Sequence, residues 1–269
     1  MERVDWSERW QQHRKERTWR AKSKDDWNRR SAGFAKRNKP SKSQYVKEFL
    51  GVLSISSEMT VLDMGAGPGT LSIPLSQKVS KVTAVDFSPE MIGILDNYCQ
   101  KHGIDNVETI VGAWEDDWER QGIEPHDLVI ASRSLAVDDL QQALQKMDRW
   151  AKQRVVISDR VGTGPFDPEV FRAVGRDFVA GPDYIYTLNI LYQMGIHAKV
   201  DFISPDAQRT YHSRQEAVDS CAWMLDQLTE KEEKALNDHL QLRLNQDQDG
   251  RWILAGQPQP KWAIIQWEK

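Results

Sequence analysis

Two kinds of hydrophobic pattern alternate along the middle of the chain. Short apolar runs, typical of strands covered on both faces, are separated by longer segments whose apolar residues recur at helical spacing. The expected strands are 60–64, 81–86, 107–111, 127–132 and 153–159, and the expected helices are 68–77, 89–102 and 137–151. This alternation predicts a doubly wound α/β fold, in which a mostly parallel sheet carries helices on both faces.

The pattern becomes less regular after residue 159. Residues 160–182 are rich in Gly and Pro and predict a long loop with a short helix near 168–178. The expected elements that follow are a helix at 183–195, a strand at 197–203 and a last strand at 261–267. Two apolar helical faces lie before that last strand and begin at the capping boxes Ser213-x-x-Glu216 and Thr229-x-x-Glu232. We therefore expect a helical insertion, residues 205–250, before the last strand. Its apolar faces are expected to pack against the helix at 183–195, with the N-terminal arm as a second candidate surface.

The first 50 residues predict an N-terminal helical arm. Trp6 and Trp10 share one helical face, Trp27 shares another with Phe34, and Pro40 separates these helices from a further one at 41–50. We expect this arm, residues 1–50, to act as a lid on a main domain formed by residues 51–269. Deletion of residues 1–40 is expected to abolish turnover and to leave the main domain folded.

The arm is basic, although the whole chain has a net charge of −4. Residues 1–48 hold 15 Lys or Arg and 7 Asp or Glu, and they include four of the 11 tryptophans. A basic, aromatic arm can bind nucleic acid, or it can fold back on the acidic body. The second interpretation is favoured, because nothing else in the chain looks like an RNA-binding module.

The most informative motif is a glycine loop that follows the first strand. Asp63-x-Gly65-x-Gly67-x-Gly69 comes at the end of that strand, and the next strand ends in Asp86. Such a unit brings the backbone close to a ligand and places a carboxylate where it can bind two ribose hydroxyls. The spacing is not that of a dinucleotide site, since the third glycine of G-x-G-x-x-G would fall on Thr70.

The glycine loop resembles that of class I S-adenosylmethionine (SAM)-dependent methyltransferases. The resemblance covers residues 45–160 and includes the acidic second motif at 85–91, the third strand with its adenine-side loop at 106–115, and the fourth strand at 126–132. It implies a seven-stranded sheet of order 3-2-1-4-5-7-6, SAM as cofactor and S-adenosylhomocysteine (SAH) as product. The implied cofactor-binding residues are Asp63, Gly65, Ala66, Gly67, Pro68, Gly69, Asp86, Phe87, Met91, Ala113, Trp114, Glu115 and Ser132.

The adenine-side loop departs from the family pattern. The small acidic pair that usually follows the glycine is replaced by Ala113-Trp114, so the acid that often meets the adenine amine is missing. Glu115 or a backbone group can serve instead, and Trp114 can stack on the base.

The acceptor side has no comparable motif. The Asn/Asp-Pro-Pro-aromatic signature of amino-group methylation is absent from the end of the fourth strand, which reads Ala131-Ser-Arg-Ser134. No catalytic residue is assigned, because in-line alignment alone can supply much of the acceleration of methyl transfer. The candidate substrate contacts are Arg133, Tyr184, Tyr186, His212 and Trp27. Each has a structural alternative, such as a surface salt bridge for Arg133 or core packing for the tyrosines. Asp159 and Arg160 end the fifth strand, and pairing with each other is favoured over a catalytic role.

Composition excludes several other classes of protein. No apolar run has the length of a membrane span, and the charged N-terminus has no signal region, so we expect a cytoplasmic protein. Cys99 and Cys221 are the only cysteines, and the six histidines lack metal-ligand spacing, so no metal site is expected.

Three functions remain open from the sequence. The favoured one is a SAM-dependent methyltransferase that acts on a small molecule, with no assignment of the acceptor atom or of the oligomeric state. The second is an RNA methyltransferase that uses its basic arm, and the third is a protein that binds SAM or SAH without catalysing transfer.

Overall fold

The computed structural model describes residues 4–37, 43–204 and 210–269. The expected break at Pro40, and parts of the expected helix 41–50 and insertion 205–250, lie outside the described residues. The main feature is a seven-stranded sheet of order β3-β2-β1-β4-β5-β10-β6. This order confirms the predicted doubly wound fold, because β6 and β10 stand where the sixth and seventh strands were expected. Among the described residues, no helix combines the length and apolar character needed to cross a membrane.

The first five strands of the sheet run parallel. They are β1 (Thr60–Met64), β2 (Lys81–Asp86), β3 (Val107–Val111), β4 (His126–Ser132) and β5 (Ala151–Arg160). Strand β10 (Trp262–Glu268) lies antiparallel between β5 and β6 (Lys199–Ile203). The carboxyl ends of the parallel strands, where the glycine loop lies, therefore share one edge of the sheet.

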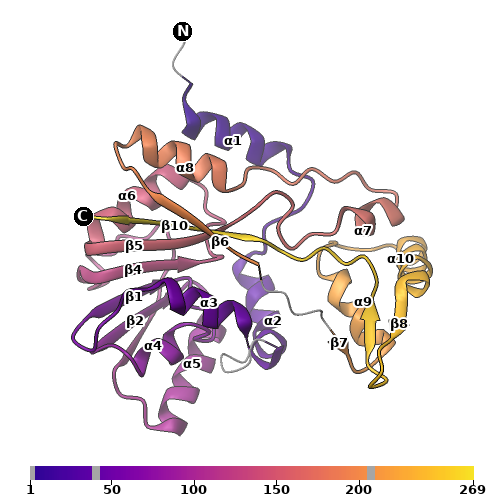
Figure 1. The fold of residues 1–269 in the computed structure, drawn as a ribbon, viewed down its shortest axis with the longest axis horizontal. Helices are drawn as coiled ribbons and strands as arrows, with labels where there is room; N and C mark the ends of the chain where they lie inside the picture. The colour runs from indigo at the N-terminus through magenta and orange to yellow at the C-terminus, as the bar shows by residue number, and fades with distance from the viewer. Residues whose placement is uncertain (1–3, 38–42, 205–209) are drawn as a thin grey trace.

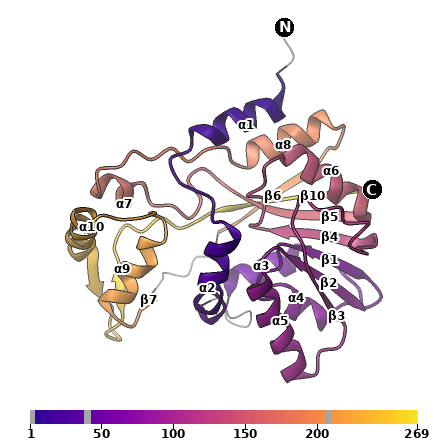
Figure 2. The same cartoon turned by 180° about the vertical axis from the view of Figure 1, so that it is seen from behind.

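Helices cover both faces of the sheet (Figures 1 and 2). One face carries α3 (Gln44–Val52), α4 (Ser72–Ser76) and α5 (Pro89–His102). The other carries α1 (Trp6–Glu16), α6 (Leu140–Trp150) and α8 (Tyr184–Gln193). The central strands are buried on both sides, and this explains their near-continuous apolar runs.

The helix expected at 68–77 is shorter than predicted. Gly65, Gly67 and Gly69 all have positive φ, so a right-handed helix cannot include residues 68 and 69, and α4 begins only at Ser72. The short helix expected at 168–178 is α7 (Pro168–Ala173), which ends just before Gly175, another residue with positive φ.

The arm consists of three separately packed helices. Helix α1 contributes Trp10, which is 6% exposed, to the main core, and α3 packs on the other face of the sheet through Tyr45 and Phe49. Between them, α2 (Lys24–Arg37) lies beyond the carboxyl ends of the strands, between the sheet and the insertion (Figure 1). The first turn of α2 is fixed by a reciprocal pair, in which Asp26 Oδ2 accepts from Ser23 N at 2.9 Å and Ser23 Oγ accepts from Asp26 N at 3.3 Å.

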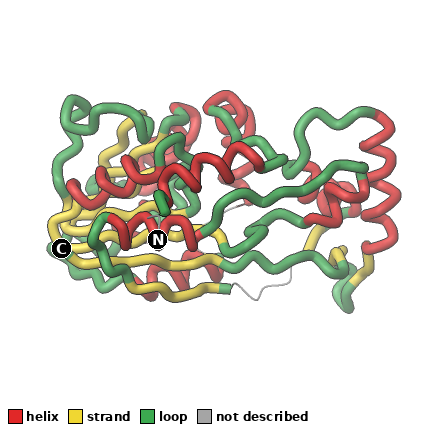
Figure 3. Tube along the Cα trace, turned by 90° about the horizontal axis from the view of Figure 1, so that it is seen from above, coloured by secondary structure: helices red, strands yellow, loops and turns green. Residues whose placement is uncertain are grey.

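The insertion forms a separate lobe at one end of an elongated molecule (Figure 3). The lobe contains α9 (Arg214–Ala222), α10 (Glu230–Arg243) and a three-stranded sheet that the sequence analysis missed. It extends past the expected boundary at 250, because one strand of that sheet lies at 252–254. The strands of that sheet are β7 (Thr210–Tyr211), β8 (Leu244–Gln246) and β9 (Trp252–Leu254). The predicted capping box at Thr229 is complete. The one predicted at Ser213 is not, because the Glu216 carboxylate accepts from His212 N and not from Ser213 N.

The insertion helices were expected to pack against the helix at 183–195, and this expectation is wrong. Their apolar faces pack instead against α7 and the preceding loop, in a cluster that contains Phe166, Phe171, Cys221 and Leu240. The aromatic rings of that loop and of α7 supply the apolar surface, and Trp19 from the arm packs against the same cluster. The arm contact, which was also anticipated, is therefore present.

Candidate functional site

The glycine loop follows β1 and turns sharply at the carboxyl edge of the sheet. Gly65, Gly67 and Gly69 have φ values of +79°, +57° and +83°. A Cβ on Gly65 would lie 2.3 Å from Ser134 Cβ, and one on Gly69 would lie 2.4 Å from Leu95 Cδ1. A Cβ on Gly67 would meet nothing within 4 Å, so this part of the loop borders open space. The loop is thus packed closely at both ends and open at its centre.

Asp86 ends β2 beside this open part of the loop. It is 6% exposed, and its two oxygens accept from Gly67 N and Ser88 N, both at 2.9 Å. Burial raises the pKa of Asp86. A carboxylate oxygen has two acceptor sites, so each oxygen can accept one further hydrogen bond. This arrangement fits a ligand with two neighbouring hydroxyl groups.

Asp63 supports the loop from the buried side. It is 1% exposed and accepts a hydrogen bond from Ser72 Oγ at 2.6 Å. Burial, with a smaller contribution from the charge of Asp86, raises the pKa of Asp63 to about 7. The hydrogen bond to Ser72 fixes the start of α4 beside the loop. Because Asp63 is buried, its carboxyl oxygens are not accessible to solvent.

The adenine-side loop after β3 is held by its own polar groups. Ala113 N donates to Asp116 Oδ2 at 2.8 Å, and Trp114 Nε1 donates to Ser134 O at 3.1 Å. The Trp114 ring lies 5.8 Å from the ring of Trp118, and Glu115 is exposed. Trp114 therefore connects this loop to the segment after β4.

Phe87, Met91 and the remaining loop residues occupy the positions that the motifs imply. Phe87 is half-buried directly after Asp86, and Met91 is 2% exposed in the first turn of α5. Ala66 N donates to Val85 O at 3.0 Å, and Pro68 is buried between the glycines. The structure thus brings the candidates from β1, β2 and the loop after β3 to one edge of the sheet.

Sequence reasoning missed two residues at this edge. Ser134 lies against Gly65 and donates to Met64 O at 2.8 Å. Asn28 of α2 accepts from Ser88 Oγ at 2.6 Å. Ser88 is the N-cap residue of α5 and follows directly after Asp86 and Phe87. Ser134 stood in the quoted segment 131–134, but nothing in the arm pattern pointed to Asn28.

Ser132 belongs to a hydroxyl cluster at the ends of β4 and β5. The Tyr45 hydroxyl lies 2.7 Å from Ser132 Oγ and 2.6 Å from the buried Ser158 Oγ. The guanidinium of Arg133 lies 4.0 Å from the centre of the Tyr45 ring and 5.7 Å from that of Trp262. Arg133 therefore stacks on aromatic rings in place of the surface salt bridge that was its alternative.

The other substrate candidates do not form one pocket. Tyr186 packs against Trp6 of α1, and Tyr184 packs against Phe202 of β6. Trp27 lies edge-on to Phe34 of its own helix. His212 is exposed in the insertion, where its Nε2 lies 3.4 Å from Arg251 Nη2. Packing roles thus account for most of the contacts of these side chains.

Asp159 and Arg160 end β5 without the side-chain pairing that the sequence favoured. The Asp159 carboxylate accepts from Thr187 Oγ1 and from Arg160 N, both at 2.7 Å. The Arg160 guanidinium instead donates to Pro182 O. Arg160 thus contacts the segment that leads into α8.

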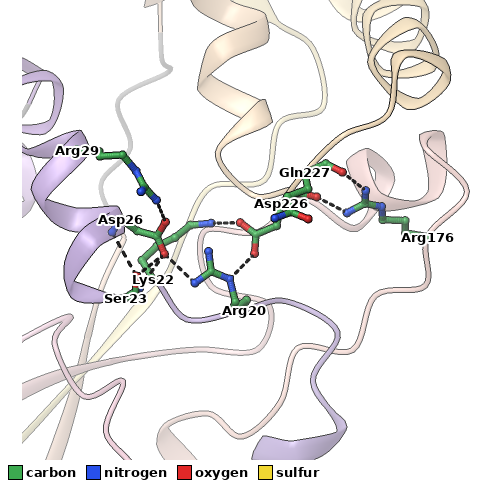
Figure 4. Close-up of polar contacts among 8 residues, drawn as sticks. All are labelled: Arg20, Lys22, Ser23, Asp26, Arg29, Arg176, Asp226 and Gln227. Carbon is green, nitrogen blue, oxygen red and sulfur yellow. Dashed lines mark hydrogen bonds and ion pairs between the residues drawn. The ribbon is translucent and has the colours of Figure 1, made fainter.

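An ionic network, which we call the clasp, joins the arm to the insertion (Figure 4). Asp226 accepts from Lys22 Nζ at 2.7 Å and from Arg20 Nε at 3.2 Å. Arg20 also pairs with Asp26 at 2.7 Å, and Asp26 pairs with Arg29 at 2.7 Å. The side chains of Lys22 and Asp26 are only 11% and 10% exposed, so the clasp is partly shielded from water.

A surface hollow of about 770 Å³ lies at the opposite edge of the sheet. Arg154, His197 and Glu268 are among its lining residues, and none of the candidate cofactor residues is. It opens where β5 begins, away from the glycine loop, so it is not part of the candidate site.

Comparison with known proteins agrees with this geometry. Residues 55–170 match a family model described as a methyltransferase domain. The magnesium protoporphyrin IX methyltransferase of Synechocystis, solved with bound SAH, superposes with a TM-score of 0.52 at 18% identity, over 69% of this chain and 92% of that one. Residues 55–170 thus belong to a methyltransferase domain, and the chain has the fold of the class I SAM-dependent methyltransferases.

Two relatives differ in how much of this methyltransferase they match. An uncharacterized protein of Haemophilus influenzae is 34% identical over 90% of this chain and 88% of its own length. An uncharacterized RNA methyltransferase of Listeria innocua is 32% identical over 39% of this chain. The match spans only 24% of that relative's length, so most of the relative has no counterpart here.

Proposed function

We propose that this methyltransferase transfers the methyl group of SAM to a small-molecule acceptor, which binds at the carboxyl ends of β4 and β5. SAM supplies an electrophilic methyl group on a sulfonium. The protein's task is then to bind the cofactor, to align the acceptor with that methyl group and to exclude water.

We assign cofactor binding to the glycine loop and its neighbours. Asp86 accepts from the two ribose hydroxyls, and Gly65 to Gly69 pass close to the methionine end. Phe87, Met91 and the loop 113–115 lie against the adenine. Support for these roles comes from the open side of Gly67 and from the unused acceptor sites of Asp86.

The observation that carries the small-molecule proposal is the cover over this edge of the sheet. Asn28 of α2 bonds to Ser88, beside the ribose position, and Trp19 Nε1 donates to Ala180 O at 2.8 Å. An acceptor must fit beneath these segments, which favours a small molecule over a folded RNA. Within the arm, α2 and the preceding residues 17–23 are therefore the part that we propose as a lid.

A second candidate function is RNA methylation. Its support is the basic arm and the partial match to proteins named RNA methyltransferases. Several arm cations already pair with the body, however, because Arg14 pairs with Asp138, and Arg20 and Lys22 pair with Asp226. These contacts support an arm that folds back on the protein.

Mass spectrometry after incubation with isotope-labelled SAM separates the two functions. The full chain is incubated with a metabolite extract and, separately, with total RNA from the same cells. We expect the label in a metabolite and background label in RNA. Label confined to RNA, together with RNA binding that falls steeply with salt, would overturn the small-molecule proposal. A variant that lacks the Asp86 carboxylate controls for labelling that does not need the site.

A further inference from the structure

An unusual cluster of cations lies where the arm crosses the end of β5. Arg17 leaves the end of α1, and Arg160 ends β5. Both guanidiniums stack on Trp19, with distances to its ring centre of 4.6 Å for Arg17 and 5.1 Å for Arg160. A Cβ placed on Gly181 would lie within 3.4 Å of both Arg17 Cβ and Arg160 Nη2, so the two side chains meet at this glycine.

The two arginines of this cluster lack a carboxylate partner. Among the described residues, neither Arg17 nor Arg160 forms an ion pair, and Arg160 Nη1 is buried without a hydrogen-bond acceptor. Burial and the neighbouring cations Arg14 and Arg160 lower the pKa of Arg17 to about 10. Asp138 acts on Arg17, and Asp159 and Asp183 act on Arg160, through their charges. In the described part of the chain, however, no carboxylate lies within ion-pair distance of either guanidinium, so both can accept a direct anionic partner.

The nearby acids already have other partners. Asp138 pairs with Arg14 at 2.5 Å, and Asp159 accepts from Thr187 Oγ1. Asp183 caps α8 through Ile185 N and accepts from Gly162 N at 2.9 Å. A guanidinium prefers an oxyanion that it can bind through two parallel hydrogen bonds. An anionic ligand would supply the missing acceptors.

We propose that Arg17 and Arg160 bind a carboxylate or phosphate group of the methyl acceptor, with Trp19 as the wall between them. This inference rests on the proposed function, because it places the anion on the acceptor side, at the end of β5. Arg17 belongs to the segment that leads into α2, so binding of the anion would also hold the lid down. The acceptor is then an anionic small molecule, and a neutral analogue would lose this contact.

Fluorine NMR of the full chain labelled with 5-fluorotryptophan tests this subsite. The Trp19 resonance is assigned with Trp19→Phe, and the protein, saturated with SAH, is titrated with benzoate, with inorganic phosphate and with neutral benzamide. We expect a saturable shift of the Trp19 signal with benzoate or phosphate and none with benzamide. The anion that binds with the higher affinity, benzoate or phosphate, indicates whether the acceptor carries a carboxylate or a phosphate group.

Variants of the cluster give the decisive comparison. Arg17→Gln should weaken anion binding by about tenfold or more, because it removes charge-assisted hydrogen bonds. Arg17→Lys should retain part of the affinity, and Lys15→Gln, a matched charge change on the exposed side of α1, should change it by less than about twofold. Because Arg17 is half-buried beside Arg14 and Arg160, Arg17→Gln should leave the melting temperature unchanged or raise it, whereas a purely structural arginine would lower it.

The outcomes separate this inference from the proposed function. Calorimetry of SAH binding is run on the same samples. No saturable shift with either anion, or equal affinity in Arg17→Gln and the unmodified protein, would overturn the anion subsite even if SAH binds. Failure of the unmodified protein to bind SAH would instead overturn the proposed cofactor site.

Discussion

Two buried carboxyl groups, Asp63 and Asp86, lie at the glycine loop, but their surroundings give them different tasks. Asp86 has unused acceptor sites at the open side of the loop, whereas Asp63 is enclosed and bonded to Ser72. Both have raised pKa values because burial penalises the charged form. The sequence motif grouped the two as cofactor residues, and the structure separates a ligand-facing acid from a supporting one.

The first prediction concerns Asp86. Asp86→Ala should weaken SAH binding by roughly 30- to 1000-fold, since loss of two charge-assisted hydrogen bonds costs about 2–4 kcal/mol. Isothermal titration calorimetry measures the effect, with circular dichroism to establish that the variant is folded. Asp105→Ala, at an exposed acid, is the matched control. Unchanged SAH affinity in Asp86→Ala would contradict the assigned ribose contact.

The second prediction concerns the pH dependence of stability. The folded-state pKa of Asp63 is about 7, against 3.8 for the free side chain, so between these values the native state holds more protons than the unfolded state. Asp63 therefore makes the free energy of unfolding fall as pH rises from about 4 to 7, by at most about 1.4 kcal/mol per pH unit. Above that range its contribution is constant.

Asp63→Asn isolates this effect. The amide oxygen can still accept from Ser72 but does not ionise, so urea unfolding at pH 5 and pH 8 should differ less in the variant than in the unmodified protein. Asp86 and Asp159, whose pKa values are also raised, contribute in the same direction and remain in both proteins. Identical pH dependence in the two proteins would show that Asp63 ionises normally.

Among the elements, α2 differs from the other arm helices in how it is held. Helices α1 and α3 bury aromatic side chains in the main clusters, whereas α2 packs along α5, bonds through Asn28 to Ser88 and is joined by the clasp to the insertion. No described residue of α2 belongs to a core cluster. Polar and ionic contacts are individually weaker than core burial and are easier to open, so α2 is the arm element best suited to move for ligand entry.

The third prediction follows from the clasp. Asp226→Asn removes the charge that Arg20 and Lys22 share, so amides of α2 should exchange with deuterium several-fold faster, while global stability falls by about 1 kcal/mol or less. Hydrogen–deuterium exchange mass spectrometry measures both the local and the global effect. Asp219→Asn is the control, because that exposed acid of α9 bonds only within its helix, to Gln215. Equal exchange of α2 in the two variants would mean that the clasp does not hold it.

At the scale of the whole molecule, the arm is part of the fold. Trp10 lies in the core that contains the sheet, α6 and α8, and Trp6 N donates to Gln193 Oε1 at 3.1 Å. Removal of residues 1–40 would therefore expose the main core. The sequence-based expectation that the main domain stays folded without these residues overlooked this burial, so point variants test the lid better than truncation.

The fourth prediction compares two tryptophans of the arm. Trp10→Ala should lower the free energy of unfolding by about 3–5 kcal/mol, as expected for a large buried side chain. Trp27→Ala should cost much less stability, because Trp27 is half-buried and belongs to none of the core clusters that hold Trp10 and its neighbours. Urea denaturation of the two variants checks the difference. A larger loss for Trp27→Ala would mean that α2, not α1, anchors the arm.

The sequence alone determined the elements whose signals are local. Apolar runs of five to seven residues specified the central strands, and the glycine loop specified a sharp turn after the first strand, because close packing at Gly65 and Gly69 and the positive φ of all three glycines require that residue. The sheet order and its mostly parallel character also followed, through the resemblance to a known family, whereas the antiparallel direction of β10 emerged only from the structure. The division into an arm, 1–50, and a main domain stays a prediction.

Only the tertiary structure decided which distant segments meet. Asn28 bonds to Ser88, Arg17 stacks with Arg160 on Trp19, and the insertion packs on α7. Periodicity shows that a helix has an apolar face, but not which surface covers it, and a lone cation in a sequence shows nothing of its partners. Contacts between residues more than 50 positions apart depend on how the whole chain closes, so the acceptor side of the site could not be predicted from local pattern.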